Sequence, residues 1–141
     1  MPHKVDNDIL IPEMGLLLQE GKDVRFTPTG VSMRPFIEGE RDIVILRRLP
    51  VVHVGDIVLA KIINHKYVLH RIIAIKGEHI TLQGDGNLAG TEQCCPNDIL
   101  GTVVQIIKPN GRIKRLTRGR IWYHLRPFRK LLLKIYRHLC I

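Results

Sequence analysis

The apolar positions of this chain change their spacing twice, and these changes divide it into three parts. In residues 8–21 apolar side chains recur mostly every three or four positions, which predicts a short amphipathic helix that ends at Gly21. From residue 23 onward the chain breaks into runs rich in Val and Ile, separated by Gly, Asn, Asp or Pro, and this pattern is typical of β-strands. Residues 119–141 return to helical spacing.

These runs predict a mainly β fold. The expected strands are 23–29, 42–49, 56–63, 66–75, 79–84 and 99–107. Short turn segments at 64–66 and 76–78 predict two hairpins. The stretch 84–98 is the longest segment rich in turn residues, and we expect a functional loop there.

The last part of the chain predicts an amphipathic helix, interrupted or restarted at Pro127. Its apolar face is formed by Ile121, Leu125, Phe128, Leu132, Ile135 and Leu139. We therefore divide the chain into a helix that packs on the body (1–22), a β-rich body (23–110) and a basic amphipathic helical tail (111–141).

Composition agrees with one globular domain. The chain has 141 residues, of which 45% are hydrophobic and 25% are charged. We expect no transmembrane helix, because no apolar run approaches the roughly 18–20 residues that span a bilayer, and the first residues do not resemble a signal peptide. Three cysteines, an odd number, make a disulfide framework improbable and favour a reducing compartment, the cytoplasm. No histidine or cysteine spacing indicates a metal site.

The net charge of +9 is concentrated at one end of the chain. Residues 1–98 carry 11 Lys+Arg and 13 Asp+Glu, whereas residues 99–141 carry 11 Lys+Arg and no acidic residue. Three interpretations of the tail remain open: a helix on an anionic membrane surface, a helix packed on the body, or an arm that contacts nucleic acid phosphates. The wide apolar face favours the membrane, because it exceeds what an arm that only follows phosphates needs. The expected membrane contacts are Trp122, Leu125, Phe128, Arg129, Lys130 and Leu132.

Three segments carry residues with catalytic potential. Ser32 lies between Gly30 and Pro35, so it sits on a tight loop where a nucleophile would be exposed, although Gly-x-Ser is also an ordinary turn sequence. His70 lies in the middle of an otherwise apolar strand, where it is either a general base or a satisfied core histidine. Asp85, between two glycines, is either an orienting carboxylate or a plain turn residue.

Taken together and in this order, the segments resemble a known family. GVSMRPF, DIVILRR, VGDIVLAKI, YVLHRIIAIKG, LQGDGN and ILGTVV look like the S24/S26 serine peptidases, which include the signal peptidases and the LexA-type repressors. The resemblance covers roughly residues 24–107 and is much more specific than any single segment. It implies a LexA/signal-peptidase-like β-rich catalytic domain.

The resemblance also implies roles for individual residues. Ser32 matches the nucleophile, His70 the general base of the Ser-His branch, and Asp85 the aspartate near this dyad. Met33 and Pro35 match positions that shape the loop. Gly30 stands where bacterial signal peptidases often carry an oxyanion-hole serine, so the hole would depend on backbone N–H groups.

We therefore expect a serine endopeptidase that cleaves a peptide or a leader-like or signal-like segment and needs no cofactor. The expected location is the cytoplasm or the cytoplasmic face of the membrane. Two alternatives remain: a catalytically inactive peptide-binding module of the same fold, or a regulator that associates with nucleic acid through its basic tail.

Overall fold

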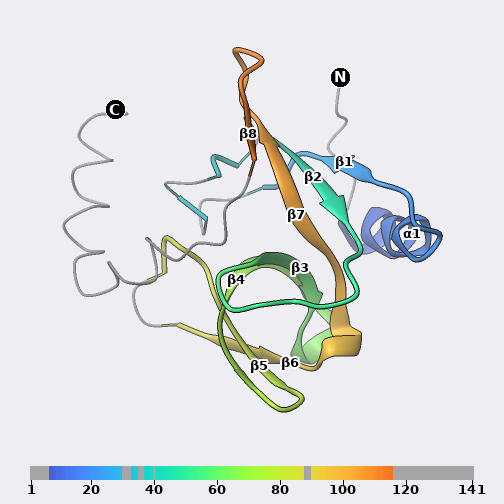
Figure 1. Cartoon of the computed structure of the whole chain (residues 1–141), viewed down its shortest axis with the longest axis vertical. Coiled ribbons are helices and arrows are strands. Elements are labelled where there is room, and N and C mark those ends of the chain that lie inside the picture. Colours follow the sequence, from blue (N-terminus) through green and yellow to red (C-terminus); the bar gives the residue numbers. More distant parts are fainter. Residues whose placement is uncertain (1–6, 30–32, 35–36, 40, 88–89, 116–141) are drawn as a thin grey trace.

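One antiparallel sheet forms the body of the protein (Figure 1). The computed structural model describes residues 7–29, 33–34, 37–39, 41–87 and 90–115. Its helices are α1 (Asn7–Gln19), η1 (Ile63–His65) and η2 (Pro96–Asp98). Its strands are β1 (Val24–Phe26), β2 (Ile43–Arg47), β3 (Ile57–Lys61), β4 (Tyr67–Lys76), β5 (His79–Gln83), β6 (Glu92–Cys94), β7 (Ile99–Ile107) and β8 (Ile113–Arg115).

The sheet order brings segments together that are distant in the sequence. The strands run β1-β2-β7-β3-β4-β5-β6, every pair is antiparallel, and β8 pairs with β7. The register shifts within the β2–β7, β3–β7 and β4–β5 pairs. Such bulges bend strands and increase their twist, and the sheet in Figure 1 is strongly twisted.

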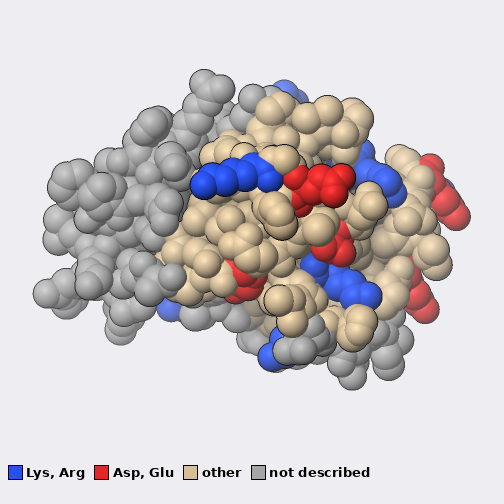
Figure 2. Space-filling view, turned by 90° about the horizontal axis from the view of Figure 1, so that it is seen from below, with Lys and Arg blue, Asp and Glu red and all other residues tan. Residues whose placement is uncertain are grey.

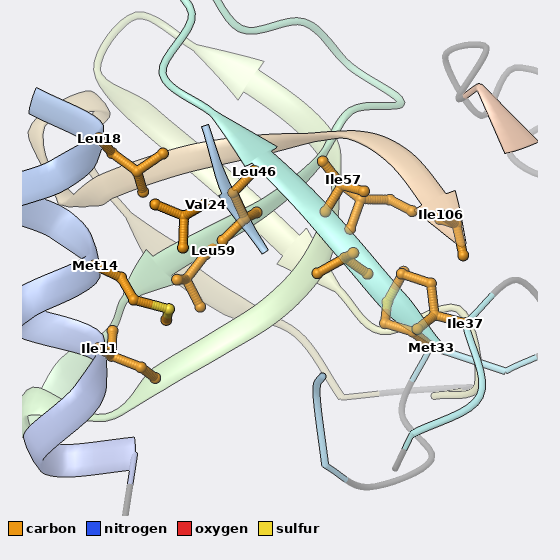
Figure 3. Packing of buried hydrophobic residues seen from close by; sticks show 12 residues of the cluster. Ile11, Met14, Leu18, Val24, Met33, Ile37, Leu46, Ile57, Leu59 and Ile106 are labelled. Atoms are coloured by element: carbon orange, nitrogen blue, oxygen red, sulfur yellow. The ribbon is translucent and has the colours of Figure 1, made fainter. Parts of the chain in front are cut away.

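Apolar side chains fill two clusters. The larger cluster lies where α1 packs against the sheet, and its buried members are Ile11, Met14, Leu18, Val24, Met33, Ile37, Val44, Leu46, Ile57, Leu59, Val103 and Ile106. Figure 3 shows the three α1 residues of this cluster pointing toward the strands. The second cluster consists of Val58, Ala60, Ile72, Ile80, Leu82 and Cys94. Consecutive residues such as Val58 and Leu59 belong to different clusters, because side chains alternate between the two faces of a strand.

The helix α1 ends as its sequence predicts. Gly21 has a φ of 84°, its N–H donates to the carbonyl of Leu18, and the N–H of Lys22 donates to the carbonyl of Leu17. This pair of bonds is a Schellman motif, in which glycine takes the left-handed conformation that other residues avoid. The helix spans Asn7–Gln19 rather than 8–21, since the last two positions belong to this cap.

Two expected boundaries are wrong. The predicted loop 84–98 contains β6 and η2, and the predicted tail 111–141 begins with β8 instead of a helix. The β7–β8 hairpin turns at Gly111, whose φ is 84°, and is closed by the N–H of Lys108 donating to the carbonyl of Arg112. All three residues of β8 are exposed and two are basic, a composition typical of edge strands that avoid further pairing.

The mainly β architecture and the short N-terminal helix are confirmed, whereas the helix predicted for residues 119–141 lies outside the described residues. Within the described part of the chain, no helix combines the length and the apolar character needed to cross a membrane.

Candidate active site

His70 occupies the centre of β4, and its imidazole contacts a carboxylate. Only 5% of the residue is exposed. Its Nδ1 atom lies 2.9 Å from Oε2 of Glu92 on β6. A carboxylate oxygen that is ionised accepts hydrogen bonds and donates none, so Nδ1 is the donor. When the imidazole is neutral with its proton on Nδ1, Nε2 keeps its lone pair, which is the form that a general base requires.

Strand order and register place this pair together. Leu82 of β5 pairs with Ile72 of β4 on one side and with Glu92 of β6 on the other. Paired positions point to the same face of a sheet and side chains alternate along a strand, so His70, Ile72, Leu82 and Glu92 share one face. The strand β5 ends before the position opposite His70, which lets the long Glu92 side chain reach the imidazole past the end of β5.

Asp85 does not orient His70 as the sequence predicts. Its Oδ1 and Oδ2 atoms accept hydrogen bonds from Nε and Nη2 of Arg71 at 2.8 and 2.7 Å, and both side chains are almost fully buried. Nη1 of Arg71 donates to the carbonyl of Gly55 at 2.7 Å. Arg71 follows His70 directly on β4, so the two side chains point to opposite faces, and Asp85 lies on the Arg71 side. The orienting role at Nδ1 therefore belongs to Glu92.

Asp85 has a different structural connection to the predicted nucleophile loop. Its backbone N–H donates to Sδ of Met33 at 3.5 Å, and Met33 is only 4% exposed. The N–H of Ile37 donates to the carbonyl of Met33 at 3.0 Å, and the side chain of Arg34 donates to the carboxylate of Glu38, four residues later. Met33, predicted to shape this loop, is thus held both by the hydrogen bond from Ile37 and by the segment after β5.

A pocket of about 150 Å³ lies beside His70. Thr29 and Met33, which flank positions 30–32 in the sequence, line this pocket together with His70. The other described lining residues are Ile11, Phe26, Pro28, Ile37, Gly39, Leu59, Tyr67, Val68 and Leu69. The residues on both sides of the Ser32 segment therefore line the same pocket as His70.

Some predicted site residues have no described position. Gly30, Ser32 and Pro35 lie outside the described residues, and so do the tail positions predicted to contact a membrane. The contact between Ser32 and His70 stays a prediction. Among the described residues, no group of three or more His, Cys, Asp or Glu side chains is arranged to hold a metal ion.

Sequence reasoning missed Glu92 and the partnership of Arg71. Glu92 lies in the stretch 84–98, where glycines and polar residues predict a loop, and a three-residue strand has too few positions to show an alternating pattern. The sequence favours Asp85 because glycines flank it and because it matches the aspartate of the resembling family. Alternation along β4 does predict opposite faces for His70 and Arg71, but not which carboxylate each one meets.

No family model matches this sequence, and no curated protein matches it either.

Proposed function

We propose that this protein is a serine endopeptidase of the S24/S26 type, in which Ser32 is the nucleophile, His70 the general base and Glu92 a positioning residue. The observation that carries the proposal is a buried histidine whose Nδ1 is held by a carboxylate, beside a pocket that both flanks of the Ser32 segment line. The LexA/signal-peptidase-like fold is part of the same proposal, supported by the single antiparallel sheet and by the order of the motifs.

The mechanism follows from the tautomer that Glu92 selects. As Oγ of Ser32 attacks the carbonyl carbon of a peptide bond, its proton passes to Nε2 of His70. The imidazolium, stabilised by Glu92, returns that proton to the leaving amine as the C–N bond breaks. Water then attacks the acyl-enzyme with the same proton transfers and restores Ser32. Arg71 and Asp85 act on this site through structure, because the N–H of Asp85 binds Met33 beside the Ser32 segment.

A peptide can also find backbone partners beside the pocket. The first residues of β4, Tyr67–Leu69, pair with β3 on one edge, whereas the pairing with β5 begins only at Arg71. Among the described strands, none covers the other edge of Tyr67–Leu69. A polypeptide that adds there as a strand would place its backbone next to His70. This edge also favours the second candidate function, a peptide-binding module without turnover.

The test is peptide cleavage by the full chain and its variants. We expect the wild type to cleave members of a mixture of synthetic leader-like and signal-like peptides, read out by mass spectrometry. Ser32→Ala and His70→Ala should lower kcat/KM by about 10³-fold or more, since each removes a group that reacts. Equal cleavage by all three proteins would refute the mechanism, and retained peptide binding without cleavage by any of them would support the binding module.

Glu92 needs a test that separates positioning from folding. We expect Glu92→Gln to lower kcat by about 10²- to 10⁴-fold with little change in KM, because an amide can hold the imidazole in the wrong tautomer. The matched control is Gln93→Ala, the exposed neighbour on the same strand, which should leave kcat unchanged. Nitrogen-15 NMR of the His70 ring should show protonated Nδ1 in the wild type and a changed tautomer ratio in Glu92→Gln. The same tautomer in both would contradict the role of Glu92.

The basic tail supports a location for this activity. We propose that residues 119–141 attach the enzyme to an anionic membrane surface on the cytoplasmic side. The support is their amphipathic spacing, the absence of acidic residues beyond Asp98 and the presence of Trp122.

A further inference from the structure

The pocket beside His70 is built from segments that are far apart in the sequence. The helix α1 contributes Ile11, β1 contributes Phe26, and β3 contributes Leu59. The first half of β4 contributes Tyr67 and Leu69. Figure 3 shows Ile11 and Leu59 on facing elements, one on the helix and the other on the sheet. The pocket therefore lies where α1 meets the open edge of β4.

Size and chemistry define what this pocket can hold. This partly open pocket of about 150 Å³ has room for a benzene molecule, six carbon atoms in all, and most of its described lining residues are aliphatic or aromatic. No Asp, Glu, Lys or Arg belongs to its described lining, and the polar side chains there are Thr29, Tyr67 and His70. A leucine or phenylalanine side chain matches this volume, whereas alanine would leave most of it unfilled and lysine would lose the hydration of its charge.

We infer that this pocket selects a leucine-sized or phenylalanine-sized apolar side chain of the polypeptide bound beside His70, and that α1 forms the wall that sets its depth. The inference rests on the proposed function for its substrate, a polypeptide, but the capacity of the pocket is a property of the folded protein. Ile11 lies outside residues 24–107, the part of the chain in which the peptidase motifs occur. The helix thus adds a specificity element to the body.

The first experiment measures the pocket without chemistry. The full chain carrying Ser32→Ala is titrated with the N-acetyl methylamides of leucine, phenylalanine, alanine and lysine and followed by NMR. We expect saturable chemical-shift changes at Met33, Leu59 and Leu69 with the leucine and phenylalanine compounds. The alanine and lysine compounds should bind at least about tenfold more weakly. No saturable shift with leucine or phenylalanine, or equal binding of all four, would overturn the inference whether or not peptides are cleaved.

The second experiment tests the wall. Ile11→Ala should deepen the pocket and shift the preference between the two large compounds toward phenylalanine by about tenfold. Met14→Ala is the matched control, because Met14 is a buried residue of the same helix and cluster that does not line the pocket. Since Ile11→Ala also removes buried contacts, thermal unfolding of both variants is followed in parallel.

A second pair of variants keeps the test decisive if α1 does not tolerate the change. Phe26→Ala enlarges the pocket from β1, and Val24→Ala is its control on the same strand. An unchanged ranking of the compounds in both Ile11→Ala and Phe26→Ala would overturn the proposed lining. Selective binding of the compounds without any Ser32-dependent peptide cleavage would support the proposed pocket and refute the peptidase function. The two proposals can therefore fail separately.

Discussion

Two carboxylates of this protein, Asp85 and Glu92, lie close in sequence but have different partners. Asp85 is 1% exposed and forms a two-bond ion pair with Arg71, whereas Glu92 binds the imidazole of His70. A buried guanidinium needs a carboxylate to offset its lost hydration, and an imidazole needs only one acceptor to select its tautomer. The flanking glycines and the family resemblance predict Asp85 as the orienting group, but Asp85 lies on the Arg71 face of β4 and pairs with Arg71 instead.

Removal of the charge on Asp85 should be costly. We expect Asp85→Asn to lower the free energy of unfolding by about 3–5 kcal/mol, because it removes the carboxylate charge that pairs with the buried Arg71. The control is Asp23→Asn, whose pair with Arg47 is about half exposed and should contribute less than about 1 kcal/mol. Urea unfolding of both variants measures the difference. Similar small losses in both would show that the buried pair does not stabilise the fold.

The two adjacent cysteines should react at different rates. Burial raises the pKa of the Cys94 thiol to about 11, whereas Cys95 is exposed. At pH 8 only about one in a thousand Cys94 thiols is ionised, so we expect iodoacetamide to modify Cys95 at least about tenfold faster. Peptide mapping by mass spectrometry measures both rates, and equal rates in the folded protein would contradict this environment for Cys94.

The raised pKa of Cys94 also makes the free energy of unfolding depend on pH. In the unfolded chain this thiol ionises at its ordinary pKa near 9, before it does so in the folded protein. The folded state then binds more protons, so the stabilising contribution is complete below about pH 9 and declines as the pH rises toward 11.

At the scale of whole elements, α1 and β7 fit each other through two small residues. A Cβ atom on Gly101 of β7 would lie 3.1 Å from Cδ1 of Leu18, and one on Gly15 of α1 would lie 3.2 Å from Cδ2 of Leu100. Each glycine thus accommodates a leucine of the other element. Leu18 is fully buried, so it has little room to move away.

This fit predicts that an added methyl group destabilises the protein at Gly101 but not at Gly90. Gly101→Ala should lower the free energy of unfolding by about 1–3 kcal/mol, because the added methyl group overpacks the interface at Leu18. Gly90→Ala, where the new Cβ would meet nothing within 4 Å, is the control and should stay within about 0.5 kcal/mol of the wild type.

A double-mutant cycle completes this test. In a Leu18→Ala background the cost of Gly101→Ala should fall toward zero, because the residue that it overpacks is gone. If Gly101→Ala lowers the free energy of unfolding equally in the Leu18→Ala background, its effect comes from the strand itself and not from the contact with Leu18.

At the scale of the whole molecule, charge is distributed very unevenly along the chain. Figure 2 shows Lys and Arg side chains lying beside Asp and Glu side chains on one face of the described residues, without a single continuous basic surface. In the described ion pairs, Arg47, Arg71 and Lys108 each lie beside a carboxylate as well. The excess of positive charge therefore belongs mainly to the segment after Asp98.

This separation predicts that the body and the tail can be tested apart. We expect vesicles that contain anionic lipid to retain the full chain and to release a chain that ends after residue 117, which keeps β8. Raised salt should weaken the retention, because polybasic attraction is screened. Vesicles of neutral lipid are the control, and equal retention of both chains on anionic vesicles would refute membrane attachment through the tail.

The sequence alone determined where β1 to β5 and β7 lie, though not β6 or β8, and where α1 ends, because alternation, Val and Ile content and the position of Gly21 are local properties of the chain. It also determined that Ser32 and His70 belong to a pattern resembling a peptidase. Only the tertiary structure decided that Glu92, and not Asp85, holds the imidazole of His70, and that Ile11 lines the neighbouring pocket. The physical reason is that these contacts depend on strand order and register, which many distant pairings set together.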